Sequence, residues 1–145
     1  MNKKYINPKT GKKYSFFDRK GNGTDDVLMW AKMFEGKASK KEYRIVKQEY
    51  TWLGFHVSTV WLGLDHSFGA DTDPLIFETM VFRPGSWAEL DMDRYTTEKQ
   101  AKIGHNVLVC KWSNPLYILF KLIDQKTWSI QWKFNKLLRK IRKRT

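Results

Sequence analysis

Two short segments, residues 55–64 and 75–82, constrain the fold of this chain more than any other feature of its sequence. Both are dense in β-branched and aromatic residues, which are the types enriched in β-strands. Residues 43–50 carry further β-forming side chains among charged ones, so the sequence predicts three strands. A loop is expected from residue 83 to residue 97. Because sequential strands with short links pair as antiparallel neighbours, we expect an antiparallel sheet of three or four strands.

The alternation of side chains along these strands predicts how the sheet is covered. Along residues 75–82, the side that carries Glu78 is otherwise apolar, and the opposite side is mostly apolar as well. In the preceding strand, Ser58 falls on one side, whereas Thr59 and Trp61 fall on the other. Because two apolar faces need two covers, we expect helices on one face and a partner or a ligand on the other.

Helical patterns flank the strands. A short amphipathic helix is predicted over residues 25–35, with Thr24 as its N-cap. Thr97 and Gln100 form a capping box that predicts a second helix over about residues 98–112. The buried face of this second helix should carry Ala101, Gly104, His105, Leu108 and Trp112. We expect it to cover the sheet in an α+β fold, and we expect its histidine to be a core residue and not a catalytic base.

A long amphipathic helix is predicted at the C-terminus, where Asn114 and Pro115 serve as N-cap and first helical residue. Its seam follows a heptad spacing with one polar member, and comprises Leu116, Phe120, Ile123, Thr127, Ile130, Phe134, Leu137 and Ile141. At 1.5 Å per residue, a helix over residues 115–143 would be about 43 Å long, which exceeds the width of the remaining domain. We therefore expect a homo-oligomer formed through residues 115–143. The alternatives are a helix folded across its own globule and a helix bound to lipid or nucleic acid.

The net charge of +12 is concentrated at the two ends of the chain. Residues 1–20 hold seven basic residues and one acidic residue, and residues 111–145 hold ten and one, whereas the part between them is mildly acidic. The sequence thus divides into a basic N-terminal arm (1–23), an α+β core domain (24–113) and a basic amphipathic C-terminal helix (114–145). We expect the ends either to bind nucleic acid non-specifically or only to keep the protein in solution.

The single cysteine, Cys110, excludes an intramolecular disulfide and a multi-cysteine zinc site, and it favours a reducing compartment. No segment reaches the roughly 18 uncharged apolar residues that a bilayer span requires. The first four residues are not followed by an apolar signal core. We therefore expect a soluble, unsecreted protein without a membrane span.

Catalytic motifs are missing from the sequence. It contains no nucleophile elbow, P-loop or dinucleotide fingerprint, and its three histidines are isolated from one another. We therefore expect a non-enzymatic protein without a cofactor. A group of possible oxygen and imidazole ligands comprises Asp65, His66, Asp71, Asp73 and Glu78. Its spacing matches no established metal loop, so we expect these acids to cap turns and predict no metal site.

Three motifs carry a resemblance to known proteins. They are VSTVWLGLDHSFG at residues 57–69, PLIFETMVF at residues 74–82, and RYTTE at residues 94–98 with Gly-His at 104–105. Together they resemble a small protein family that is widespread in tailed bacteriophages, over residues 16–108 of this chain. The resemblance implies a phage accessory protein that acts in the host cytoplasm. Among such proteins we expect one similar to the anti-defence sponges that sequester the cyclic dinucleotide signals of bacterial CBASS immunity.

Such a sponge needs no catalysis, only pockets lined by aromatic rings, hydroxyl groups and cations. The residues that we expect to bind the nucleotide are Thr59, Trp61, His66, Phe68, Glu78 and Arg83. The aromatic rings would stack on a base, Arg83 would contact a phosphate, and Glu78 would accept from a guanine edge. The other interpretation of Trp61 is that it fills the core. Two other functions stay open, a binder of nucleic acid or of a host protein that acts through the basic ends, and a virion component.

Overall fold

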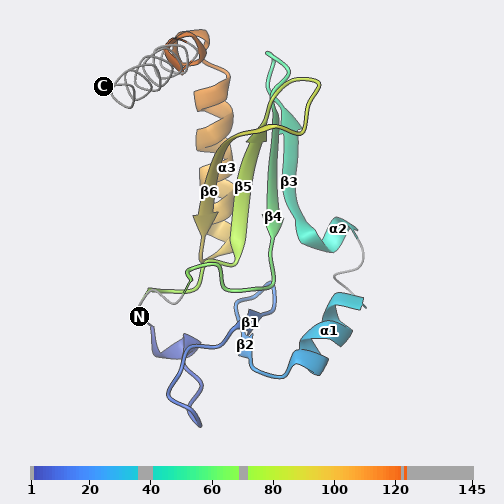
Figure 1. Cartoon of the computed structure of the whole chain (residues 1–145), viewed down its shortest axis with the longest axis vertical. Coiled ribbons are helices and arrows are strands. Elements are labelled where there is room, and N and C mark those ends of the chain that lie inside the picture. Colours follow the sequence, from blue (N-terminus) through green and yellow to red (C-terminus); the bar gives the residue numbers. More distant parts are fainter. Residues whose placement is uncertain (1, 36–40, 69–71, 122, 124–145) are drawn as a thin grey trace, which may run out of the picture.

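A four-stranded antiparallel sheet forms the centre of the computed structural model, which describes residues 2–35, 41–68, 72–121 and 123 (Figure 1). The strands are β3 (Ile45–Tyr50), β4 (His56–Trp61), β5 (Phe77–Phe82) and β6 (Glu89–Tyr95), and they are neighbours in that order. Helices accompany the sheet, so the predicted α+β class with an antiparallel sheet is confirmed. None of the helices in the described part of the chain is long and apolar enough to cross a membrane.

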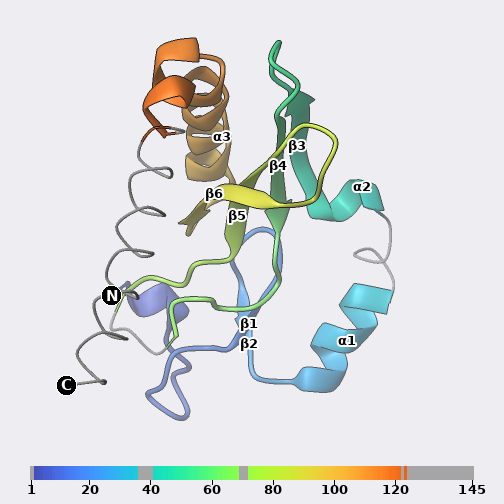
Figure 2. The same cartoon turned by 45° about the horizontal axis from the view of Figure 1, so that its top comes forward.

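One face of the sheet is covered by α3 (Glu98–Trp112), which runs along the strands in both views (Figures 1 and 2). The helix begins at the predicted capping box. The Thr97 hydroxyl accepts a hydrogen bond from the Gln100 amide at 3.2 Å, and the Gln100 side chain accepts one from the Thr97 amide at 3.0 Å. The buried residues of the helix are Ala101, His105, Leu108 and Trp112. These match the face that the sequence predicted.

The strand registers separate two faces as the alternation predicted. Thr59 lies opposite Thr79 on the face beneath α3. The remaining face, here called the open face, carries Gln48, Tyr50, His56, Ser58, Val60, Glu78, Met80, Phe82, Met92 and Arg94. Among the described helices, α1 (Val27–Glu35) and α2 (Lys41–Arg44) lie beside one end of the sheet and do not run along this face (Figures 1 and 2).

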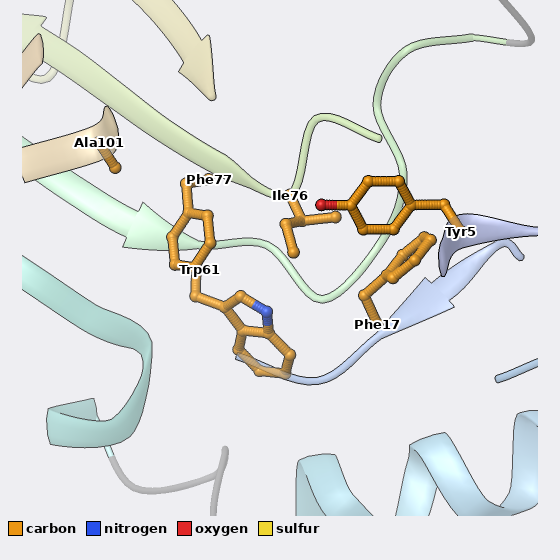
Figure 3. Close-up of a cluster of buried hydrophobic side chains, with 6 residues drawn as sticks. All are labelled: Tyr5, Phe17, Trp61, Ile76, Phe77 and Ala101. Atoms are coloured by element: carbon orange, nitrogen blue, oxygen red, sulfur yellow. The ribbon is translucent and has the colours of Figure 1, made fainter. Parts of the chain in front are cut away.

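The N-terminal residues pack into the globule and do not form a separate arm. A short 3-10 helix, η1 (Lys3–Tyr5), and the paired strands β1 (Phe16–Phe17) and β2 (Gly23–Thr24) close one end of the sheet. Tyr5 and Phe17 join Trp61, Ile76 and Phe77 in a buried cluster (Figure 3). Burying an aromatic side chain contributes about 1.5–3 kcal/mol. These long-range contacts correct the expectation of an arm over residues 1–23.

The expected loop from residue 83 to residue 97 is wrong, because β6 occupies much of it and pairs with β5. Acidic residues are depleted in strands, so the acidic residues of β6 made this segment look like a loop in the sequence. At the edge of a sheet, however, charged side chains reach solvent or a partner. Asp91, for example, accepts hydrogen bonds from Lys111 Nζ at 2.8 Å and from Trp112 Nε1 at 2.9 Å.

The first helix starts two residues later than predicted. Asp26 caps it, since its Oδ1 accepts hydrogen bonds from the amides of Leu28 at 2.9 Å and Met29 at 3.0 Å. Thr24 is therefore not the N-cap. Its hydroxyl instead accepts a hydrogen bond from the amide of Asp26 at 3.1 Å, just ahead of the helix. A carboxylate binds the positive end of a helix more strongly than a hydroxyl does, which explains the shift.

The predicted start of the C-terminal helix is confirmed, because residues 115–121 are helical. Asn114 Oδ1 accepts a hydrogen bond from the Leu116 amide at 2.9 Å, as an N-cap should. Most of the heptad seam, and with it the expected oligomer contact over residues 115–143, falls outside the described residues.

Candidate functional site

Two of the six residues expected to bind a ligand are buried beneath α3. Thr59 is 0% exposed and Trp61 is 2% exposed. Trp61 packs in the cluster with Phe17, and its ring meets the edge of Tyr43 at a centroid distance of 5.5 Å (Figure 3). The interpretation of Trp61 as a core residue is confirmed, and neither side chain lies on the open face.

Thr59 belongs to a buried polar chain. Its hydroxyl lies 2.7 Å from the Thr79 hydroxyl and 2.7 Å from His105 Nδ1. On the other side of the ring, His105 Nε2 lies 3.4 Å from Glu49 Oε1, which is too long for a strong hydrogen bond. Burial, and then the positive charge of Lys47, lower the pKa of His105 and favour the neutral imidazole. The order of carboxylate, imidazole and hydroxyl resembles that of a hydrolytic relay. Because the Thr59 hydroxyl is fully buried, however, these hydrogen bonds instead connect α3 to β4 and β5.

Asp65 organises the loop that follows β4. Its Oδ1 accepts hydrogen bonds from the amides of Ser67 at 2.9 Å and Leu75 at 3.1 Å, and its Oδ2 lies 2.7 Å from Lys13 Nζ. Burial alone would raise the pKa of this carboxyl, but these hydrogen bonds outweigh burial and hold the pKa below its usual value. The turn-capping role is therefore confirmed for Asp65.

Within the described ranges, no group of three or more histidine, cysteine or acidic side chains is placed to hold a metal ion. Asp73 accepts a hydrogen bond from the Asn2 amide at 2.8 Å, and Glu78 is paired with Arg94. Asp71 lies outside the described residues.

Three predicted site residues gather at one end of the open face. Glu78 is 6% exposed, and its Oε2 lies 2.7 Å from Arg94 Nε. The guanidinium of Arg94 lies 5.8 Å from the centroid of the Phe68 ring, and His66 meets the edge of that ring at 6.0 Å. Phe68 is 83% exposed. A guanine edge would have to displace Arg94 to reach the Glu78 carboxylate.

The sixth residue, Arg83, lies at the opposite end of the sheet in a cavity of about 190 Å³, here called the tip pocket. Two hairpin turns form it, one between β3 and β4 and the other between β5 and β6 (Figure 1). Its lining residues are Tyr50, Gly54, His56, Arg83, Gly85, Ser86 and Trp87. Gly54 and Gly85 adopt φ values of +82° and +68°, which other residues rarely adopt, so glycine permits both turns.

Aromatic rings dominate the tip pocket. His56 stacks on Tyr50 at a centroid distance of 4.7 Å, and Trp87 meets the edge of the His56 ring at 6.1 Å. Tyr50 and Trp87 are 71% and 79% exposed, so large areas of π surface face solvent. Partial burial lowers the pKa of His56, which favours an uncharged ring at neutral pH. The pocket thus combines neutral aromatic planes with the guanidinium of Arg83.

The structure does not bring the six predicted residues into one site. Arg83 alone lines the tip pocket, and its neighbours Tyr50, His56 and Trp87 were missed. Trp87 follows Gly85 closely, and an aromatic residue beside a glycine turn was the available sequence signal.

Comparison of the chain with protein-family models, with curated proteins and with solved structures finds no match. The relation to a phage family therefore stays a prediction from the three motifs quoted above. What the protein binds has to be inferred from its own side chains.

Proposed function

We propose that this protein is a phage-encoded, non-enzymatic anti-defence protein that sequesters a small nucleotide signal, such as a cyclic dinucleotide, in the host cytoplasm. The observation that supports the proposal best is the tip pocket, in which Arg83 lies beside the rings of Tyr50, His56 and Trp87. The phage origin and the host compartment rest on the resemblance described above.

The chemistry of the tip pocket suits a nucleotide. Stacking of a base on an aromatic side chain is worth about 1–3 kcal/mol and tolerates any base. A guanidinium binds phosphate through two parallel N–H groups, which lysine cannot do. No acidic side chain lines the pocket in the described part of the chain, so nothing there repels a phosphate.

The size of the tip pocket limits how much of a ligand it encloses. Its volume of about 190 Å³ is below the range of roughly 300–1,000 Å³ that is usual for small-molecule sites. We infer that it holds one base and the adjoining phosphate, and that the second half of a dinucleotide extends over the exposed Trp87 ring or reaches a second copy of the chain. This division would explain why a sponge needs the expected homo-oligomer.

Calorimetry of the full chain with a panel of cyclic dinucleotides and cyclic trinucleotides tests the proposal. Arg83→Gln and Trp87→Ala should each weaken binding about tenfold or more, because a charged hydrogen bond or a stacked base is lost. Phe68→Ala is the matched control, since it removes another exposed ring at the far end of the open face. A loss of binding in Phe68→Ala alone would move the site to the Glu78 and Arg94 end.

The fate of the ligand distinguishes sequestration from catalysis. Nucleotide released by denaturing the complex should be chemically intact by mass spectrometry. Cleaved nucleotide would reject the non-enzymatic part of the proposal. Failure of every panel member to bind would reject the nucleotide itself.

A second candidate function is non-specific binding of nucleic acid through the basic N-terminal residues. Five lysines there are exposed, namely Lys3, Lys4, Lys9, Lys12 and Lys20. The N-terminal elements lie at the end of the sheet away from the tip pocket (Figure 1). Replacing all five by glutamine should therefore reduce DNA binding and its salt dependence without changing nucleotide binding. Fluorescence anisotropy with a single-stranded oligonucleotide at two salt concentrations measures the DNA affinity and its salt dependence.

A further inference from the structure

A second cavity lies on the other side of Arg83, between the sheet and the start of the C-terminal helix. Its volume is about 300 Å³, and we call it the flank pocket. It is lined by Phe55, Arg83, Pro84, Leu90, Trp112, Ile118 and Lys121. Nothing in the sequence patterns or in the proposed function uses this cavity.

The floor of the flank pocket is apolar and held in place. The Trp112 ring lies 5.1 Å from the ring of Phe55, and its indole N–H donates to Asp91 Oδ2 at 2.9 Å. The same carboxylate oxygen lies 2.8 Å from Lys111 Nζ, so the negative charge of Asp91 is already compensated. Because the one polar atom of the indole has its partner outside the cavity, the ring presents only carbon to an occupant.

The charged groups of the flank pocket are all positive. Arg83 and Lys121 line it, and no acidic side chain lines it among the residues that the structure describes. An apolar cavity that carries two cations discriminates between ligands by charge, because only an anion compensates them.

Charge also argues against residues 124–145 of the chain itself as the occupant of the flank pocket. Residues 124–145 contain eight lysines and arginines against a single acid, Asp124. Arg83 and Lys121 would repel such a segment, whereas they would attract a small molecule with one anionic group.

We propose that the flank pocket binds a small amphiphilic anion, an aliphatic or aromatic carboxylate, with its apolar part on Trp112 and Leu90. The carboxylate is then shared by Arg83 and Lys121. A volume of about 300 Å³ is at the lower limit of the usual range of roughly 300–1,000 Å³, so the occupant is a medium-chain and not a long-chain acid. The inference does not depend on the proposed nucleotide function.

Three probes of equal chain length test it on the full-length protein, namely decanoate, decanol and decyltrimethylammonium. Binding is followed by NMR through the indole N–H signal of Trp112, which is assigned by its loss in Trp112→Phe. Decanoate should shift the Trp112 signal and leave that of Trp61 in place, because Trp61 lies in the other buried cluster. Decanol should bind about tenfold more weakly, because it lacks the charged hydrogen bonds.

A charge-matched pair of variants tests the anchor. Lys121→Glu should weaken decanoate binding about tenfold or more, since it replaces an attractive charge by a repulsive one. Lys99→Glu changes the net charge equally at an exposed position of α3 that does not line the pocket, and it should leave binding unchanged. Equal effects of the two variants would overturn the inference. An unshifted Trp112 signal, or equal affinity for all three probes, would overturn it as well.

The nucleotide proposal and the carboxylate proposal can be rejected independently of each other. Nucleotide binding is read at the indole of Trp87, which lines the tip pocket and not the flank pocket. Carboxylate binding is read at Trp112, which lines the flank pocket and not the tip pocket. A nucleotide that shifts Trp87 together with a decanoate that shifts nothing would reject the flank site alone. The opposite result would reject the nucleotide site alone.

Discussion

Glu78 and Arg94 form an ion pair between β5 and β6, with 2.7 Å between Glu78 Oε2 and Arg94 Nε. The carboxylate side chain is 7% exposed and the guanidinium side chain 24% exposed. Removal of the cation would leave a buried charge without its partner, which costs about 3–5 kcal/mol. We expect Arg94→Leu to lower the free energy of unfolding by about 3 kcal/mol, measured by urea denaturation. Glu78→Gln in the Arg94→Leu background should restore part of the loss. Equal stability of Arg94→Leu and of the double variant would show that the ion pair is not buried in solution.

Gly104 lies inside α3, where alanine would ordinarily be the better helix former by about 1 kcal/mol. A Cβ at this position would overlap the ring and the hydroxyl of Tyr95. We therefore expect Gly104→Ala to destabilise the protein by about 2 kcal/mol, the opposite sign to helix propensity. Thermal unfolding measures the change. The penalty should shrink in a Tyr95→Leu background, and a stabilised Gly104→Ala variant would contradict the close packing of α3 on β6.

Glu98 joins the N-terminal part of the chain to α3. The hydrogen bond from Arg19 Nε, 2.8 Å from Glu98 Oε2, is the main reason why the pKa of Glu98 falls from 4.5 to about 2. A carboxyl with a lowered pKa stabilises the folded state above its unfolded pKa, and this contribution is lost as the pH falls from 4.5 to about 2. Glu98→Gln should remove about 1–2 kcal/mol of the stability at neutral pH, allowing for partial solvent screening. Unfolding curves between pH 2 and 7 should show a shallower acid dependence in the variant. An unchanged slope would exclude the contact with Arg19.

His105 should make the stability depend on pH near neutrality. Burial lowers the pKa of its imidazole below the usual 6.5, so the unfolded chain binds more protons than the folded chain below about pH 6.5. The free energy of unfolding should therefore fall as the pH drops from about 7 to about 5.5. His105→Gln should reduce this slope, which urea denaturation at several pH values measures. His56, whose pKa burial also lowers, would retain part of it. A slope equal to that of the unmodified protein would contradict a neutral, buried His105.

The elements that the sequence predicted well are those whose signals are local. The three strands and α3 follow from β-branched runs and from the Thr97 and Gln100 capping box, each of which involves residues close in sequence. Tyr5 and Phe17 were harder to place, because they are buried only by contact with residues such as Ile76, far along the chain. No local pattern contains such a contact.

The candidate site was less predictable than the fold. Tyr50 and His56 come together in the tip pocket because the strand register sets them opposite each other on β3 and β4. A register shift of one residue would turn these side chains to the other face, so composition alone could not identify them. The prediction instead combined Thr59 and Glu78, which belong to opposite faces of the sheet.

Arg83 lines both the tip pocket and the flank pocket, and this has a consequence for how the two respond to each other. One guanidinium cannot turn fully toward two separate anions at once. An anion bound in one pocket therefore weakens the binding of an anion in the other pocket. Thermodynamic linkage requires that each anion reduces the affinity for the other by the same factor. The two proposals together therefore predict antagonism between two chemically unlike ligands through a single side chain, without any movement of the sheet.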